Sequence, residues 1–391
     1  MTTSLKVFYL FCTCAAIIII PYIGAWIHFD GHFPANYFQY PPLVAPEKAG
    51  FSLPVFVAVA IMFISLIVLY LFPSVYGFKK VTSVATPQIN KVKLPAWFWA
   101  GLVMWGGTLF ILWGKFSEPR WIILWADLPL FWGFALLVDG WVYVRNGGRS
   151  IISRSLQEFI GIGVASISGW LIFEYLNFFV DDNWIYPNGA LIPDNQFTIY
   201  AVIGSAGLMP LAFEWYTLFL TFDRLKYRFD DGPKIKLSIG VINALLVFCF
   251  VLLFFIAFYP DLLFTLLWVV PLIILSAVLD RLKIWTPFEL VKKGNWSPLL
   301  LFALAYFVQG FLLEFWNYFS AYHENGKIIS ETPAYWSYSV PYVNVYHVFE
   351  MPVLGLMGYL PFGIYCIIWW VVFAYMLNIP TQFADERHMH A

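Results

Sequence analysis

Two glutamates, each followed by an asparagine three residues later, are the residues whose type and spacing point most directly to chemistry. They are Glu174 with Asn177 and Glu314 with Asn317. A spacing of three places both members of a pair on one face of a helix. Each pair ends a long apolar stretch, where an ionised carboxyl group is costly unless it is paired, hydrated or protonated. Because a protonated carboxyl group is a general acid, we predict that these four residues are catalytic. The alternative is a hydrated glutamate at a helix end.

Each pair is followed by a segment that is aromatic rather than charged. Trp184 and Tyr186 follow the first pair, and Trp336 and Tyr338 follow the second. We predict that these four residues and Glu350 bind a substrate in an apolar pocket, because aromatic faces attract the cationic intermediates that form when an alkene is protonated. The alternative is a belt of aromatic residues at a membrane surface.

The histidines provide only weak candidates for a metal site. His28 and His32 are four residues apart, and His347 lies in a different segment. A zinc site would require these segments to meet, and Gly31 and Pro34 end any helix near the first two residues. We therefore predict no metal, and the sequence identifies no cofactor.

The glutamates belong to a pattern that occurs twice along the chain. The separation between matching residues is 143 from Trp125 to Trp268 and 140 from Glu174 to Glu314. Apolar helices resemble one another by chance, but matched acidic, amide, tryptophan and proline residues rarely do. We therefore predict a duplication, with a site where the two copies meet. The other matched residues are Pro129, Asp139, Asn177, Trp184, Tyr186, Gly204, Gly207 and Pro210 in the first copy, and Pro271, Asp280, Asn317, Trp336, Tyr338, Gly355, Gly358 and Pro361 in the second.

The composition indicates an all-α integral membrane protein. Hydrophobic residues make up 61% of the chain and charged residues only 12%, about half the charged share of a soluble domain. The net charge of -1 provides no basic face, so we predict no nucleic-acid partner. Ten stretches are long enough to cross about 30 Å of hydrocarbon as helices. They cover residues 6–27, 53–76, 95–114, 121–144, 155–180, 197–222, 237–259, 261–281, 298–320 and 352–378.

The basic residues predict how these helices are oriented. Loops 77–94, 145–154, 223–236 and 281–293, together with the two tails, hold 18 of the 22 Lys and Arg residues. Positive residues gather on the cytoplasmic side, so we predict a protein of the bacterial cytoplasmic (inner) membrane with both termini in the cytoplasm. A two-helix segment (1–94) then precedes two parallel four-helix repeats, 95–234 and 235–391, related by an axis along the membrane normal.

Three further features concern the interior of the predicted spans. Gly161, Ala165 and Gly169 are spaced by four residues, which predicts close packing of a neighbouring helix. The matched prolines predict kinked helices, and broken helices often border a substrate site. Asp127 and Glu214 lie inside spans without a counterpart in the other copy, as expected of a site specialised in one half.

Two resemblances accompany these patterns. The sequence EFWNY at 314–318, Trp336 with Tyr338, and FEMPVLGLMGYLPF at 349–362 resemble a group of uncharacterised bacterial polytopic membrane proteins. This resemblance implies no activity. In architecture alone, duplicated helices that end in Asp or Glu resemble the membrane lycopene cyclases of the heterodimer or fused type. The Pro-x-Glu-Glu signature of those enzymes is absent here, so no catalytic residue is transferred.

Three functions are compatible with these residues. The first is an enzyme that acts on a membrane lipid or isoprenoid by acid-catalysed cyclisation or isomerisation. The second is a proton-coupled transporter or lipid carrier, which needs a route from Glu174 and Glu314 to Asp139 and Asp280. The third is an accessory subunit whose aromatic loops bind a membrane-protein partner and have no pocket behind them.

Overall fold

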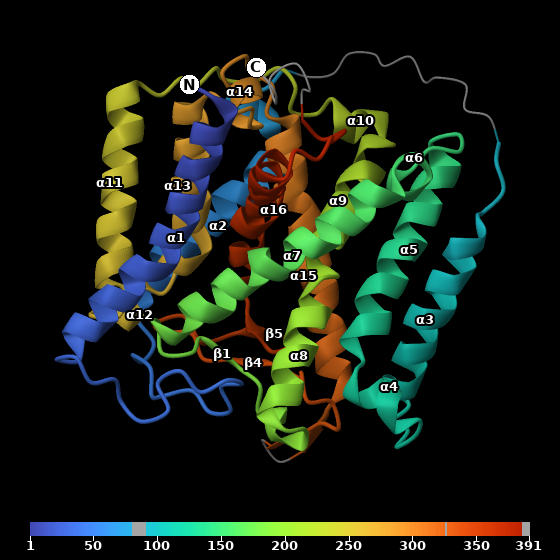
Figure 1. Cartoon of the computed structure of the whole chain (residues 1–391). Coiled ribbons are helices and arrows are strands. Elements are labelled where there is room, and N and C mark those ends of the chain that lie inside the picture. The colour runs from blue at the N-terminus through green and yellow to red at the C-terminus, as the bar shows by residue number, and fades with distance from the viewer. Residues whose placement is uncertain (80–90, 325–326, 385–391) are drawn as a thin grey trace.

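The computed structural model describes residues 1–79, 91–324 and 327–384. Arg387 and most of loop 77–94, which contribute to the charge count, lie outside the described residues. Within these ranges the chain is mostly helical (Figure 1). Eight helical segments are long and apolar enough to cross a membrane. They are α1 (Thr3–His28), α2 (Leu53–Leu71), α3 (Ala96–Trp113), α5 (Asp127–Arg145), α7 (Leu156–Phe178), α8 with α9 (Asp194–Ser205 and Leu208–Leu220), α15 (Ser297–Ser320), and η3 with α16 (Gly355–Gly358 and Tyr359–Met376).

Two predicted spans, 237–259 and 261–281, correspond to the shorter helices α11 (Ile239–Phe255) and α13 (Leu266–Leu282), each 17 residues long. The prediction of an all-α bundle of apolar helices is therefore confirmed, whereas the count of ten spans stays a prediction.

The remaining elements are short and lie in the connections. Among the described residues, the strands form three antiparallel pairs, β1–β4, β2–β3 and β5–β6. The short helices are η1 (Pro73–Tyr76), α4 (Arg120–Leu124), α6 (Ile151–Arg154), η2 (Gly189–Leu191), α10 (Asp223–Lys226), α12 (Pro260–Leu263) and α14 (Phe288–Val291). The strands are β1 (Trp184–Ile185), β2 (Tyr322–Glu324), β3 (Lys327–Ile329), β4 (Ser337–Tyr338), β5 (His347–Val348) and β6 (Met351–Pro352).

The two ends of the bundle differ in what they carry. The start of α1 and the end of α16 lie at the same end, together with α6, α10 and α14 of the basic loops (Figure 1). The opposite end carries α4, α12, β1, β4 and β5, and we call it the loop end. The basic connections described by the structure therefore gather on the side of the termini.

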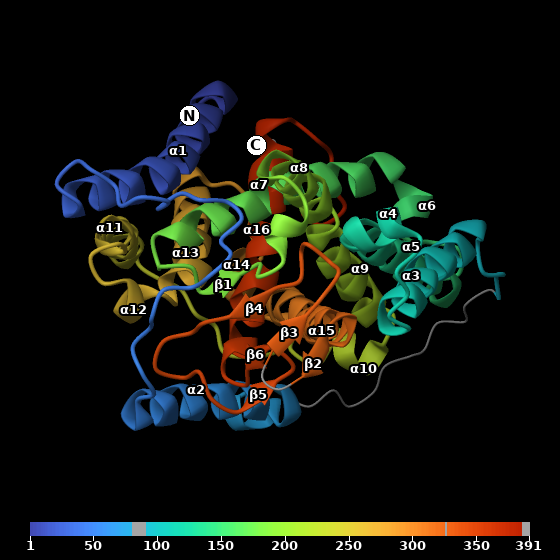
Figure 2. The same cartoon turned by 90° about the horizontal axis from the view of Figure 1, so that it is seen from below.

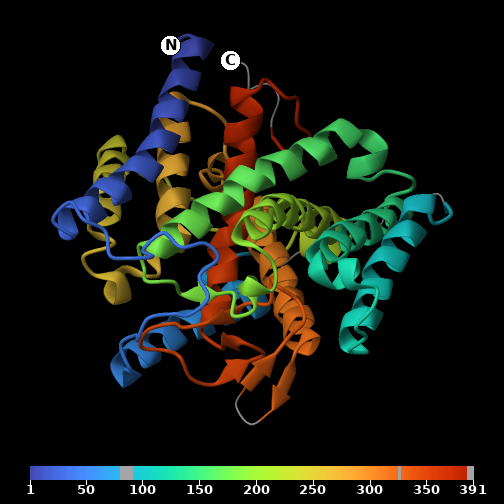
Figure 3. The same ribbon diagram turned by 60° about the horizontal axis from the view of Figure 1, so that its bottom comes forward.

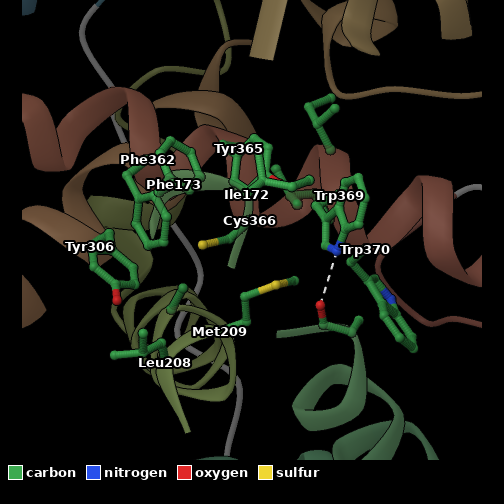
Figure 4. Close-up of a cluster of buried hydrophobic side chains, with 14 of the residues drawn as sticks. Ile172, Phe173, Leu208, Met209, Tyr306, Phe362, Tyr365, Cys366, Trp369 and Trp370 are labelled. Carbon is green, nitrogen blue, oxygen red and sulfur yellow. Dashed lines mark hydrogen bonds between the residues drawn. The ribbon is translucent and has the colours of Figure 1, made fainter. Parts of the chain in front are cut away.

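Helix α16 occupies the centre, where it contacts α7, α13 and α15, and α7 crosses it obliquely (Figure 3). Tryptophans of α16 pack against the small residues of α7. Trp369 Nε1 also donates a hydrogen bond to the Ala165 carbonyl at 2.9 Å (Figure 4). A Cβ atom added at Gly169 would lie 2.8 Å from the Trp369 ring, and one at Gly161 would lie 3.1 Å from Trp370. The prediction that these small residues permit close packing is confirmed.

Three of the four matched prolines begin a helix rather than kink one. Pro129, Pro210 and Pro361 are each the third residue of their helix, in α5, α9 and α16. In the first turn the N–H that proline lacks has no intrahelical acceptor, so proline is tolerated there. Only Pro271 lies inside a helix, α13. The breaks before α5, α9 and α16 fall within the four residues that precede each proline, where the missing N–H removes a helical hydrogen bond, so broken helices are present at these three positions.

Helix α2 lies at the edge of the molecule (Figure 2). Its Phe63 is buried against Met351, Leu354 and Leu356 of the loop that leads into α16. The other residues of α2 are less buried, so this helix is held mainly by one apolar face.

Candidate active site

The two aromatic segments predicted to bind a substrate pair with each other at the loop end. In the β1–β4 ladder Trp184 lies opposite Tyr338, and Ile185 lies opposite Ser337. Trp184 and Trp336 hold matching places in the sequence, as do Tyr186 and Tyr338, so the pairing is symmetric about Ile185 and Ser337. The ladder therefore brings equivalent parts of the two halves together.

Glu174 is buried at the end of α7, with 5% of its surface exposed. Its Oε1 accepts hydrogen bonds from Trp170 Nε1 at 2.8 Å and from the Tyr186 hydroxyl at 2.5 Å. Its Oε2 accepts one from Trp184 Nε1 at 3.3 Å. Both predicted aromatic partners of the first half therefore contact the predicted acid.

Glu314 has the same kind of surroundings at the matching place in α15, and it is completely buried. Its Oε1 accepts from Trp336 Nε1 at 3.3 Å and from the Tyr338 hydroxyl at 2.7 Å. A third donor is the Tyr359 hydroxyl, at 2.5 Å. Each carboxyl group is thus held by one tryptophan and one tyrosine of the strand that follows it.

The asparagines of the two pairs hold the strands. Asn177 Nδ2 donates to the Trp184 carbonyl at 2.9 Å, and its Oδ1 accepts from the Asn183 N–H at 2.8 Å. Asn317 Nδ2 donates to the Trp336 carbonyl at 2.8 Å, and its Oδ1 accepts from the Trp336 N–H at 3.2 Å. The asparagines therefore position the tryptophans, and neither amide lies on the cavity wall described next.

An apolar cavity of about 750 Å³ lies behind the paired strands. Glu174 borders it directly, whereas Glu314 reaches it only through its tyrosine partners. All four predicted aromatic residues line it, and one face of α2 closes it on one side. The lining residues include the aromatic and acidic side chains Trp170, Glu174, Trp184, Tyr186, Trp336, Tyr338 and Tyr359, and the α2 residues Val55, Val59, Met62 and Leu66.

Aromatic rings from both halves form the wall beside Glu174. The Trp268 ring lies 5.4 Å from Trp184 and 5.2 Å from Phe173, measured between centroids. Phe362 packs edge-on against Trp170 at 5.6 Å, and Figure 4 shows Phe173, Phe362 and Tyr306 side by side. Aromatic faces of this kind stabilise positive charge.

Trp170 and Tyr359 are functional neighbours that sequence reasoning missed. Trp170 is one helical turn before Glu174, and the matching position in the second half is Gly310. There the Tyr359 ring occupies the space, since a Cβ at Gly310 would lie 2.3 Å from it. The matching position to Tyr359 is Leu208. The third donor to each glutamate thus comes from a different helix in each half, which a comparison of matched positions does not reveal.

The tyrosine hydroxyls at the site are donors. Burial raises the pKa of Tyr186 well above its usual range, and the nearby Glu174 raises it further. Burial and Glu314 do the same for Tyr338. Both phenols therefore keep their protons at neutral pH and can pass a proton between a carboxyl group and a ligand.

Of the other residues singled out from the sequence, Asp127 borders the cavity, whereas Glu214, Glu350 and the three histidines do not. Glu350 contacts His323 Nε2 at 2.7 Å and the Tyr335 hydroxyl at 2.5 Å, and it does not border the cavity. The His28 ring packs against Phe258, and His347 contacts Asn344. In the described part of the chain, no group of three or more His, Cys, Asp or Glu residues could hold a metal ion.

The loop between α1 and α2 ties the two halves together across the loop end. Lys48 Nζ donates to the Val180 carbonyl at 2.7 Å and also to that of Asp181. The Ala49 N–H donates to Asp261 Oδ2 at 2.9 Å. Val180 follows α7 and Asp261 lies in α12, so the loop joins the first half to the second.

The fold and the site together define a polytopic helical membrane protein with an apolar cavity bordered by carboxyl–tyrosine pairs. Comparison with protein-family models, curated proteins and solved structures gives no match.

Proposed function

We propose that this chain is an enzyme of the bacterial inner membrane that acts on a lipid or isoprenoid by acid-catalysed cyclisation or isomerisation. The observation that carries the proposal is one apolar cavity that Glu174 and Tyr186 border from the first half, and Tyr338, which donates to Glu314 behind it, borders from the second half. A concave apolar site with a few convergent polar groups, and a volume between about 300 and 1,000 Å³, is typical of ligand pockets.

The proposed reaction needs no oxidant. Glu174, on the cavity wall, gives a proton to one carbon of an alkene, and the positive charge that forms lies among the rings of Trp184, Trp268 and Phe362, which line the cavity. For a cyclisation, a second double bond of the same molecule attacks the cation, so that a carbon–carbon bond closes the ring and the charge moves to a further carbon. In both reactions a neighbouring carbon then returns a proton to the Glu174 carboxylate, which leaves a new double bond and restores the acid. Glu314 exchanges protons with the cavity through the hydroxyl of Tyr338 or Tyr359, because it lies behind them.

We also propose the duplication that the sequence predicts, with repeats at 95–234 and 235–391 and ten spans. The matched contacts of Glu174 and Glu314, and the symmetric pairing of β1 with β4, support it. The transporter alternative needs a route to Asp139 and Asp280, and neither residue borders the cavity. The accessory-subunit alternative has no pocket behind the aromatic loops, whereas the cavity lies there.

The test is to identify what co-purifies with the protein in mild detergent, by mass spectrometry and absorption. Wild type is compared with Glu174→Gln and Glu314→Gln, and Glu47→Gln is the control because Glu47 is exposed on the loop at the same end. A specific lipid or polyene whose amount or structure changes in the first two variants, but not in the control, supports the proposal. Bulk membrane lipid that is identical in all four samples refutes it.

A further inference from the structure

Among the residues that the structure describes, every charged side chain on the cavity wall is acidic. Asp127 and Glu174 border the cavity. Glu314 lies directly behind Tyr338 and Tyr359, whose hydroxyl groups donate to it. The remaining polar groups of the wall are hydroxyls, indoles and one amide, and the rest is aliphatic or aromatic.

The basic side chains described near the loop end are engaged elsewhere. Lys48 Nζ is bound by the two backbone carbonyls that follow α7. Lys115 Nζ donates to two carbonyls at the end of α15, at 2.5 and 2.9 Å. Arg120 pairs with Glu331 at the surface. None of these three borders the cavity, so they do not neutralise an anion inside it.

Helix starts can also bind phosphate through free backbone N–H groups. Helix α13 begins at the cavity, directly after the lining residue Thr265, and has no proline in its first turn. Helices α5, α9 and α16 also begin there. Each has a proline as its third residue, Pro129, Pro210 or Pro361, and proline has no N–H. In α9 the N–H of the preceding residue, Met209, already donates to Ser166 Oγ at 3.0 Å. The starts of α5, α9 and α16 are therefore poor anion sites, and in α13 the Trp268 N–H already donates to the Thr265 carbonyl at 3.2 Å.

We propose that the ligand of this cavity carries no anionic headgroup and is an uncharged isoprenoid, an alcohol or a hydrocarbon. A phosphate or diphosphate placed there loses its hydration without gaining a basic side chain to neutralise its charge. It also lies beside carboxyl groups, which repel it when they are ionised. A hydroxyl group, in contrast, can exchange hydrogen bonds with the tyrosines and carboxyl groups. This inference rests on the proposed function and narrows its substrate class.

The test uses two photoactivatable probes with the same geranylgeranyl chain, one an alcohol and the other a diphosphate. Each is crosslinked to the protein in nanodiscs, and the labelled peptides are identified by mass spectrometry. We expect the alcohol to label cavity-lining peptides about ten-fold or more above the diphosphate, since an unpaired buried charge costs more than one factor of ten in affinity. Asp127→Asn narrows this ratio, because it removes a carboxyl group from the wall.

A variant that fills the cavity separates the possible failures. Val59→Trp places a large ring on the α2 wall and lowers labelling by both probes, whereas Val103→Trp on the exposed face of α3 does not. Equal or stronger cavity labelling by the diphosphate overturns the inference but leaves the proposed function standing. The proposed function and the inference are both refuted if neither probe labels cavity-lining peptides of the wild-type protein. They are also refuted if Val59→Trp leaves the labelling of those peptides unchanged.

Discussion

Glu174 and Glu314 are held by donors from separate segments of the chain. A tryptophan and a tyrosine come from the following strand, and the third donor is Trp170 in one half and Tyr359 in the other. Each carboxyl group therefore keeps a fixed orientation toward the cavity wall, which proton transfer to a bound ligand requires. The asymmetry of the third donor makes the two halves chemically distinct.

In the second half, the Tyr359 ring fills the space beside Gly310, where the first half has Trp170. We therefore predict that Gly310→Ala destabilises the protein by about 1–3 kcal/mol, because the added methyl group overpacks the Tyr359 ring. Thermal unfolding in detergent measures this effect. Gly106→Ala is the matched control, since a Cβ there meets nothing within 4 Å. In a Tyr359→Ala background, which removes every side-chain atom beyond Cβ at that position, the Gly310→Ala change should cost little. An undiminished cost in that background would show that the Tyr359 ring is not the cause.

A second prediction concerns Asp182, in the loop after α7. The pKa of its carboxyl group is raised to about 7. Burial is the largest cause, Lys48 lowers the pKa, and the nearby Asp181 and Glu174 raise it. The unfolded chain loses this proton near pH 4 and the folded chain near pH 7, so Asp182 lowers stability progressively over that interval and fully above it.

Asp182→Asn should therefore raise the melting temperature at pH 8 and change it much less at pH 4. Melting curves in detergent across this pH range, with Glu47→Gln as the control, measure the difference. A gain of the same size at both pH values would mean that ionisation of Asp182 does not limit stability.

At the scale of elements, the packing of α7 against α16 forms the centre of the bundle. The tryptophans of α16 pack against the small residues of α7, and hydrogen bonds accompany this packing. The Tyr365 hydroxyl donates to the Gly169 carbonyl at 3.1 Å, and Trp369 Nε1 donates to the Ala165 carbonyl. Because α7 also bears Glu174 and α16 also bears Tyr359, this contact sets the distance between the two halves of the site.

Trp369→Phe keeps most of the packing but removes the bond to Ala165. We expect a loss of about 1 kcal/mol, the usual size of an interhelical hydrogen bond within a membrane. Equilibrium unfolding in mixed micelles measures the loss. Trp99→Phe is the control, because Trp99 is 54% exposed on α3, and an equal effect of both variants would contradict the importance of this bond.

At the scale of the whole molecule, the cavity lies between the two halves and is completed by segments outside them. Helix α2 forms one wall, and the loop before it joins the two halves through Lys48 and Ala49. The basic short helices lie at the end opposite the cavity (Figure 1). The charge distribution therefore predicts that the cavity lies toward the outer half of the membrane.

Single cysteines in a cysteine-free background test this orientation. Arg149→Cys, beside α6, should react with a membrane-impermeant maleimide only after the cells are opened, and Ala35→Cys, at the loop end, should react in intact spheroplasts. The reverse pattern would invert the orientation, and labelling of both in intact cells would place them on one side.

The sequence by itself determined the class of protein, the positions of the long apolar helices and the matched Glu174 and Glu314. These follow from composition and spacing, because the bilayer imposes length and hydropathy on each span. It also placed the four aromatic residues that line the cavity. It did not separate them from Glu350, since residue type alone does not say which loop residues face inward.

Only the tertiary structure decided which donors complete each carboxyl group and where the cavity lies. Tyr359 reaches Glu314 because Gly310 leaves space for its ring, and β1 meets β4 although about 150 residues separate them. Such contacts depend on how helices that are far apart in the chain pack together. Local sequence patterns relate only residues a few positions apart, so they do not predict these contacts. The three helix-starting prolines illustrate the same limit, since their position relative to a break is set by the packing of the whole bundle.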